Sequence, residues 1–224
     1  MNEVVIIAQE EIEKLLSNLN NEVHIKTADI RKLSAKLYKS LPNKSKEHVF
    51  SICEELLEQY TWEMAVIAYD WAYRKKDVYT ESTFEVFEKW LERYVRGWGD
   101  CDDFCTHAFG ELICRKPQLF DRIYNWTKRE EFWMRRAAAV ILIPAIHQKC
   151  YKQLDVFAIS DALMLDEHYL VQKGYGWMLK IMSLKEPDMV FNYLMRNHEP
   201  MPRVAFRYAL EKLDKDKKVI LMKR

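Results

Sequence analysis

Apolar residues recur at helical spacing along most of the chain, and this pattern limits the possible folds more than any other feature. Three successive stretches near the amino terminus show it: Ile12, Leu15, Leu16 and Leu19; then Ile30, Leu33 and Leu37; then Val49, Ile52, Leu56 and Leu57. Strand-type alternation is not sustained anywhere. The 224 residues include only 5 glycines and 6 prolines, too few for the many tight turns of a β-sandwich or β-barrel. The sequence therefore predicts an all-α protein.

Prolines and short polar stretches divide the chain into amphipathic pieces of about 10 to 18 residues. Pro117, Pro187 and Pro202 each stand where a helix is expected to begin, which suits the preference of proline for the first helical turn. Paired helices of this length that recur roughly every 35 to 40 residues are typical of HEAT-type solenoids. Periodicity alone would also allow an irregular helical bundle.

The chain lacks any stretch with the composition of a flexible linker, so we expect a single helical-repeat domain over residues 1–224. Within it, the pattern predicts an N-terminal helix in 1–20 and repeats over 21–213. The lysine-rich tail, residues 214–224, is expected to be frayed.

Several classes of protein are disfavoured by what the sequence lacks. The longest apolar runs, Val4–Ala8 and Ala137–Ile143, fall short of the roughly 20 residues that span a bilayer, so no membrane partner is expected. The amino terminus is acidic and has no long apolar segment of the signal-peptide kind, which favours a cytoplasmic protein. Five cysteines, an odd number, then predict buried and reduced thiols rather than a disulfide framework.

A metal site is also disfavoured. Cys101, Cys105, His107 and Cys114 are conceivable zinc ligands, but the C-x3-C spacing is unusual and no second C-x2-C or H-x3-H pair follows. We therefore expect no metal and no cofactor.

The formal net charge of +1 conceals an uneven distribution of charge. Residues 41–111 are acidic overall. The later half is made basic by Lys128, Arg129, Arg135, Arg136, Lys173, Lys180, Lys185, Arg196, Arg203 and Arg207. Such an asymmetry can steer a polyanion onto one face of a protein and away from another.

Trp98 and Asp102 lie four residues apart in the segment Arg96–Asp103. On a helix this spacing places an aromatic ring and a carboxylate on one face, and the two can stabilise a positively charged sugar. In the simpler alternative, a helix begins near Asp100, and Asp102 and Asp103 only complement its dipole. The two roles are compatible, and we take Asp102 as the candidate catalytic carboxylate.

The segment Trp133–Arg136 carries two adjacent arginines of the kind that grip a nucleic-acid backbone. Neighbouring side chains on a helix point about 100° apart, so we expect one arginine to face such a backbone and the other to pair with an acid. Arg136 is the preferred backbone contact. The alternative is a structural salt bridge to Glu130 or Glu131.

The segment Tyr169–Lys180 includes Gly174, Gly176 and Trp177. The small residues would let a backbone or a DNA strand approach closely. A lone tryptophan on an apolar helix is more often a core residue than a ligand contact. On the residues alone, a core position is the simpler interpretation of Trp177.

Together these segments resemble the AlkD-like DNA alkylation repair family, DNA glycosylases built from HEAT-like repeats. Trp98 and Asp102 match the family's W-x3-D catalytic motif. Residues 133–136 match its W-x-R-R segment, and residues 176–180 match its G-W-x-L-R helix. At Lys180 the family usually has arginine, so the charge is kept but the two-point grip on phosphate is lost.

The resemblance covers residues 23–213 and begins with Val23–Leu33, similar to the family's turn into a helix with an early arginine. A helix with Thr27 as its N-cap would look the same. Just before it, Asn20-Asn21-Glu22 stands where the family usually has a glycine and an aromatic residue.

The resemblance implies a HEAT-like solenoid with a concave DNA-binding face, and a monomeric, monofunctional glycosylase acting on double-stranded DNA with cationic N3- or N7-alkylated purines. We assign catalysis to Asp102, Trp98 and Trp177, and DNA binding to Arg136, Arg135, Lys173, Lys180 and Arg203. Two alternatives stay open: a catalytically inactive relative that binds DNA structure, and a helical-repeat scaffold for a protein partner.

Overall fold

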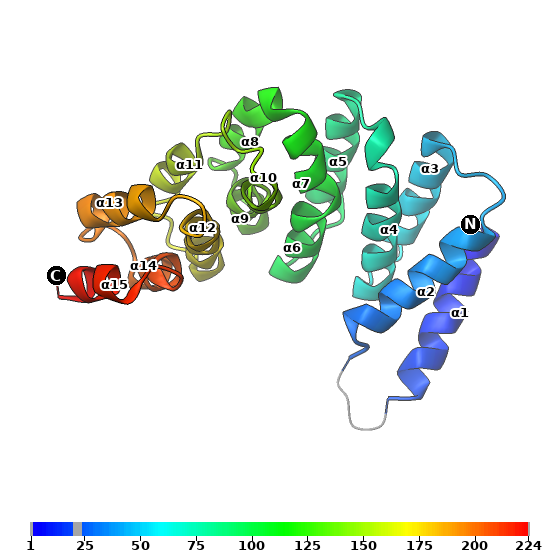
Figure 1. The fold of residues 1–224 in the computed structure, drawn as a ribbon. Helices are drawn as coiled ribbons and strands as arrows, with labels where there is room; N and C mark the ends of the chain where they lie inside the picture. The colour runs from blue at the N-terminus through cyan, green and yellow to red at the C-terminus, as the bar shows by residue number, and fades with distance from the viewer. Residues whose placement is uncertain (1, 20–23, 224) are drawn as a thin grey trace. The chain divides into compact units, whose positions relative to one another are not determined.

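The computed structural model describes residues 2–19 and 24–223, and every regular element within them is a helix (Figure 1). The all-α prediction is therefore confirmed. No helix in this part of the chain is both long enough and apolar enough to cross a membrane. The Asn20-Asn21-Glu22 segment and Val23, on which part of the sequence comparison rests, lie outside the described residues.

The first of two compact units comprises the chain up to Arg96 together with His107–Phe109. Its helices are α1 (Glu3–Ser17), α2 (Thr27–Ser40), α3 (Lys46–Leu57), α4 (Trp62–Arg74), the short 3-10 helix η1 (Lys76–Val78) and α5 (Ser82–Arg93). Helix α4 packs against both α2 and α3. As the apolar pattern predicts, α2 buries Ile30, Leu33 and Leu37.

The second unit comprises Gly97–Thr106 and the chain from Gly110 onward. Its elements are α6 (Trp98–Thr106), most of α7 (Ala108–Arg115), η2 (Pro117–Leu119), α8 (Phe120–Trp126), α9 (Phe132–Val140), α10 (Ile143–Gln148), α11 (Val156–Ala162), α12 (Tyr169–Met182), α13 (Pro187–Asn197), α14 (Arg203–Leu210) and α15 (Lys215–Met222). All candidate site residues belong to this unit.

Four helices of the second unit form a continuous row, because α9 packs against both α6 and α12, and α12 packs against α14 (Figure 1). They begin at Trp98, Phe132, Tyr169 and Arg203, which are intervals of 34, 37 and 34 residues. These intervals are close to the period that the sequence predicts. Residues at matching positions of successive repeats therefore meet across the row.

Two local predictions were wrong. Helix α2 begins at Thr27 itself, and its N-cap is Lys26, with no side-chain hydrogen bond at the cap. The tail is not frayed along its length, because Asp214 caps α15 with its carboxylate and Leu221 is buried. The early arginine of the first matching segment, Arg31, contributes a salt bridge to Asp70.

The prediction of five reduced cysteines was wrong for two of them. Cys114, near the end of α7, and Cys150, just after α10, form a disulfide with their Cα atoms 5.7 Å apart. Cys53, Cys101 and Cys105 are buried free thiols. The spacing in the sequence did not indicate the bond because the fold brings together two cysteines separated by 36 positions.

Candidate active site

Trp98 and Asp102 lie one helical turn apart on α6, as their spacing predicts. The helix begins at Trp98, two residues before the expected start near Asp100. Trp98 is 56% exposed, whereas the side chain of Asp102 is only 18% exposed. The indole ring is therefore accessible to a ligand, while most of the carboxylate is covered by protein.

Arg136 covers the Asp102 carboxylate from the neighbouring helix α9. Its Nε atom donates to Oδ1 and its Nη2 atom to Oδ2, both at 2.7 Å. This two-point geometry is the strongest arrangement of an arginine and a carboxylate. The remaining nitrogen, Nη1, donates to the carbonyl oxygen of Leu170 at the start of α12. The guanidinium thus joins three successive helices of the row.

The environment of Arg136 favours its charge. Burial of the guanidinium opposes ionisation, but the hydrogen bonds and negative charge of Asp102 outweigh that effect and raise the Arg136 pKa above its ordinary value. Only 6% of the side chain is exposed. The sequence places Arg136 at the DNA backbone, whereas the structure makes it the buried partner of the candidate catalytic carboxylate.

Arg135 points to a different acid. Its Nε atom donates to Asp166 Oδ2 at 2.5 Å, and its Nη1 atom donates to the carbonyl oxygens of Arg129 and Glu130. Both arginines of the pair therefore bind acids, where the sequence predicts that only one does. Neither partner is one of the expected acids, Glu130 and Glu131, because the contacts cross to the adjacent helix or loop.

Glycine at position 174 leaves room for the Arg136 side chain. A Cβ atom built on Gly174 would lie 3.1 Å from Arg136 Cγ, and one built on Gly176 would lie 2.8 Å from the carbonyl oxygen of Ala205 in α14. The sequence predicts that these small residues admit a backbone or a DNA strand. In the structure Gly176 admits the backbone of α14, and Gly174 admits a side chain.

Substitution of these glycines by alanine is expected to destabilise the protein in a fixed order. Gly176→Ala should cost the most, roughly 1 to 3 kcal/mol, because a backbone carbonyl cannot move aside. Gly174→Ala should cost less, since Arg136 can shift slightly and alanine favours a helix. Gly97→Ala is the control, because nothing lies within 4 Å of its added Cβ. Urea denaturation would measure the series, and an equal cost for Gly97→Ala and Gly176→Ala would contradict it.

The other predicted DNA-binding residues differ in how firmly the protein already holds them. Lys173 Nζ lies 4.4 Å from the centre of the Tyr169 ring, and a hydrogen bond to Tyr169 raises the pKa of this lysine. Lys180 Nζ forms a 2.7 Å ion pair with Glu211. Arg203 is exposed at the start of α14. Of these three, Lys180 is the most constrained.

Trp177 is half-buried on α12, one turn beyond the glycine that contacts Arg136.

The sequence analysis missed an aromatic cluster beside the two arginines. The rings of Phe132 and His168 are stacked with centroids 4.1 Å apart and planes 5° from parallel. His168 also caps α12, because its Nδ1 atom accepts from the backbone N–H of Leu170. Trp133 lies next to Phe132, and its buried indole nitrogen has no hydrogen-bond partner among the described residues. Helical periodicity could not indicate the stacking of Phe132 on His168, because one lies at the start of α9 and the other just before α12.

Comparison with known proteins assigns the chain to a family. A family model described as DNA alkylation repair enzyme matches residues 9–213. The chain belongs to this family. The resemblance that the sequence motifs indicate is thereby confirmed.

Two solved structures share the fold of this DNA alkylation repair family member. One is a predicted DNA alkylation repair enzyme from Enterococcus faecalis, with 20% identity and a TM-score of 0.69 over 95% of this chain and 96% of that one. The other is AlkD2 from Streptococcus mutans, with 17% identity and a TM-score of 0.63 over 92% and 99% of the two chains. Among curated proteins, no match was found.

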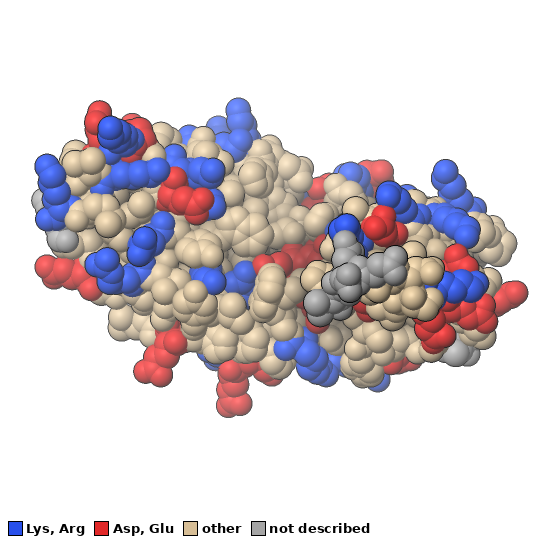
Figure 2. Space-filling view, turned by 90° about the horizontal axis from the view of Figure 1, so that it is seen from below, with Lys and Arg blue, Asp and Glu red and all other residues tan. Residues whose placement is uncertain are grey.

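Basic side chains are numerous on the surface over the C-terminal helices. Figure 2 shows lysine and arginine side chains gathered at the left, over the C-terminal helices, with some acidic side chains among them. Arg203 and Arg207 are both exposed on α14. The basic character that the sequence predicts for the later half is therefore present on the surface of this family member.

Proposed function

We propose that this family member is a DNA glycosylase that hydrolyses the N-glycosidic bond of cationic N3- and N7-alkylated purines in double-stranded DNA. The observation that carries the proposal is the candidate active site itself. Asp102 lies one turn from the exposed ring of Trp98 and is fixed at both oxygens by Arg136. A carboxylate held this firmly is oriented before any substrate binds.

The chemistry of the lesion explains why one carboxylate suffices. Alkylation at N3 or N7 gives a purine a positive charge, so the base departs as a neutral molecule without needing a proton. Ordinary glycoside hydrolysis uses two carboxyl groups because its leaving group is poor. Asp102 is left with two tasks, which are to stabilise the cationic sugar and to position the attacking water.

Arg136 limits how much Asp102 contributes. A carboxylate about 4 Å from the sugar cation is worth roughly 4 kcal/mol at an effective dielectric constant of 20. The guanidinium behind it, at about 8 Å from the sugar, opposes this by roughly 2 kcal/mol. The difference corresponds to a rate increase of about thirtyfold. Cation–π stabilisation by Trp98 and Trp177 adds roughly 0.5 to 2 kcal/mol each.

The protonation of the nearby lysine favours a monofunctional glycosylase, which removes the base without cleaving the strand. Strand cleavage would require an unprotonated amine to attack the sugar. Lys173 is the lysine next to Gly174, and its hydrogen bond to Tyr169 raises its pKa. Its amine is therefore protonated at neutral pH and is suited to holding a phosphate instead.

The basic residues of the second unit differ in how directly they act on DNA. Lys173 and the exposed Arg203 bind phosphates directly. Arg135 and Lys180 are each paired with an acid, Asp166 and Glu211, so they contribute less to DNA binding than Lys173 and Arg203 do. Arg136 acts through Asp102, because its own nitrogens are occupied by protein acceptors.

One observation favours a second candidate function. Both oxygens of Asp102 accept hydrogen bonds from Arg136, which reduces the field that the carboxylate exerts on a sugar. A family member with this arrangement could recognise the structure of DNA without excising a base. Binding of modified DNA with no release of the base would identify that function.

Selectivity for charged leaving groups tests the glycosylase proposal. We expect release of N3- and N7-methylpurines, and no release of uracil or 8-oxoguanine, because an ionised carboxylate cannot donate the proton that a neutral base requires. Single-turnover assays on duplexes that differ only in the lesion would measure this. Comparable release of uracil and N7-methylguanine would overturn the mechanism.

A further inference from the structure

The disulfide between Cys114 and Cys150 lies where each sulfur atom also has an oxygen acceptor. Cys114 Sγ is 3.7 Å from the Gln148 side-chain oxygen, and Cys150 Sγ is 3.5 Å from the carbonyl oxygen of Ala145. A thiol is a weak hydrogen-bond donor. These oxygens can therefore accept the two S–H groups when the bond is open, so one backbone arrangement suits both redox states.

The acceptor for Cys114 is held in place by further contacts. The Gln148 amide nitrogen donates to Glu111 at 3.0 Å, and Glu111 in turn accepts from Arg115 at 2.7 Å. Because the nitrogen end of the amide is engaged by Glu111, its oxygen end is left for the cysteine. When the disulfide is reduced, the Cys114 thiol therefore has a hydrogen-bond acceptor already in position.

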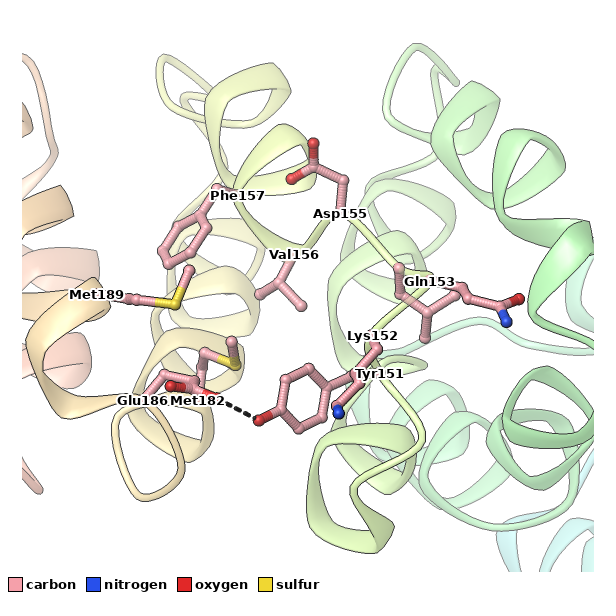
Figure 3. Close-up of a pocket in the computed structure, with 10 residues that line it drawn as sticks. Tyr151, Lys152, Gln153, Asp155, Val156, Phe157, Met182, Glu186 and Met189 are labelled. Atoms are coloured by element: carbon pink, nitrogen blue, oxygen red, sulfur yellow. Dashed lines mark hydrogen bonds between the residues drawn. The ribbon is translucent and has the colours of Figure 1, made fainter.

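Cys150 directly precedes the loop Tyr151–Asp155, which forms one wall of a pocket of about 590 Å³ (Figure 3). The pocket is also lined by Phe157, Met182 and Met189, and none of the candidate catalytic residues lines it.

The loop has three anchors. At its start the disulfide ties Cys150 to α7. Next, the Tyr151 hydroxyl donates to Glu186 at 2.8 Å, the contact drawn as a dashed line in Figure 3. At its end, Asp155 caps α11. Opening the disulfide removes the first anchor and leaves the other two.

We infer that Cys114 and Cys150 are a reversible thiol–disulfide pair that exchanges with a low-molecular-weight disulfide such as glutathione disulfide and controls the mobility of the Tyr151–Asp155 loop. In the oxidising direction, one cysteine thiolate attacks glutathione disulfide and releases the first glutathione. The second cysteine thiolate then displaces the other glutathione and closes the protein disulfide. The two cysteines lose two hydrogen atoms, and glutathione disulfide becomes two glutathione molecules.

Cys114 and Cys150 differ from the other cysteines in their exposure to solvent. Cys114 and Cys150 are both partly exposed, whereas Cys53, Cys101 and Cys105 are fully buried. Burial and the neighbouring Cys101 also raise the pKa of the Cys105 thiol, which makes it less reactive. Only the Cys114–Cys150 pair is therefore expected to respond to the glutathione buffer.

The test is to equilibrate the folded protein in glutathione buffers of graded potential, quench with acid, and alkylate after denaturation. Mass spectrometry should show one transition in which exactly two of the five thiols change together, with peptide mapping to Cys114 and Cys150. Cys114→Ser and Cys150→Ser should abolish the transition, and Cys53→Ser should retain it. Five reactive thiols in oxidised glutathione, or a bond that reduced glutathione does not open in the folded protein, would overturn the inference.

Hydrogen exchange provides the second readout. Reduction should increase amide exchange in residues 150–155 severalfold, while α9 and α12 remain protected to the same degree. Unchanged exchange in the loop would contradict the anchoring role. Both measurements are independent of whether the protein excises bases.

Discussion

Replacing Asp102 with asparagine is expected to slow excision of N7-methylguanine by about two to three orders of magnitude. The substitution removes the negative charge but preserves the shape of the side chain. It also leaves the Arg136 guanidinium unopposed near the cationic sugar, so the variant loses the attraction and keeps the repulsion. Single-turnover kinetics on a duplex with one lesion would measure the effect, and the affinity for DNA should stay nearly unchanged.

Two neighbouring carboxylates provide the controls for this variant. Asp100→Asn and Asp103→Asn remove a charge from the same helix without touching the ion pair with Arg136. They should excise nearly as well as the unmodified protein. Normal excision by Asp102→Asn together with an inactive Asp100 or Asp103 variant would show that the wrong carboxylate had been chosen.

Arg136→Ala is expected to have the largest effect on stability. It removes a side chain that is 6% exposed and leaves Asp102 without its two hydrogen bonds. Because Asp102 retains some contact with solvent, we expect a loss of about 2 to 4 kcal/mol, which lowers Tm by about 5 to 15 °C.

Lys180→Ala is the matched control for Arg136→Ala. It also removes a cation from an ion pair between helices of the second unit, but its partner Glu211 is 50% exposed. An exposed pair contributes less than about 1 kcal/mol. Urea denaturation of the two variants should separate them clearly, and equal losses would mean that the Asp102–Arg136 pair does not stabilise this part of the fold.

The sequence predicted the parts of the site that lie within one helix. Helical spacing alone places Trp98 and Asp102 on one face, and the structure agrees because the residues lie in a single regular helix. It could not predict the partner of Arg136, since helical periodicity describes one helix and the partner lies on another. A DNA phosphate and a buried carboxylate both suit an arginine, and only the packing of α9 against α6 distinguishes them.

Several contacts join residues that lie about one repeat apart in the sequence. Asp102 and Arg136 are 34 positions apart, and Tyr151 and Glu186 are 35 apart. The disulfide joins cysteines that are 36 apart. Each separation is close to one repeat, so residues one repeat apart in the sequence are candidates for direct contact. The 34-residue interval between the starts of α6 and α9 leads from Asp102 to Arg136, whereas the period of 35 to 40 residues predicted from the sequence does not.

The most direct test of the account is the rate at which the unmodified protein releases N7-methylguanine from a duplex, compared with spontaneous depurination of the same duplex. The field of Asp102, reduced by Arg136, and the cation–π contributions of Trp98 and Trp177 together predict release about two to four orders of magnitude faster than the spontaneous reaction, with an intact abasic strand as the product. Release at the spontaneous rate by protein that is bound to the duplex would contradict the proposed catalytic role of Asp102 and favour recognition of DNA structure without excision.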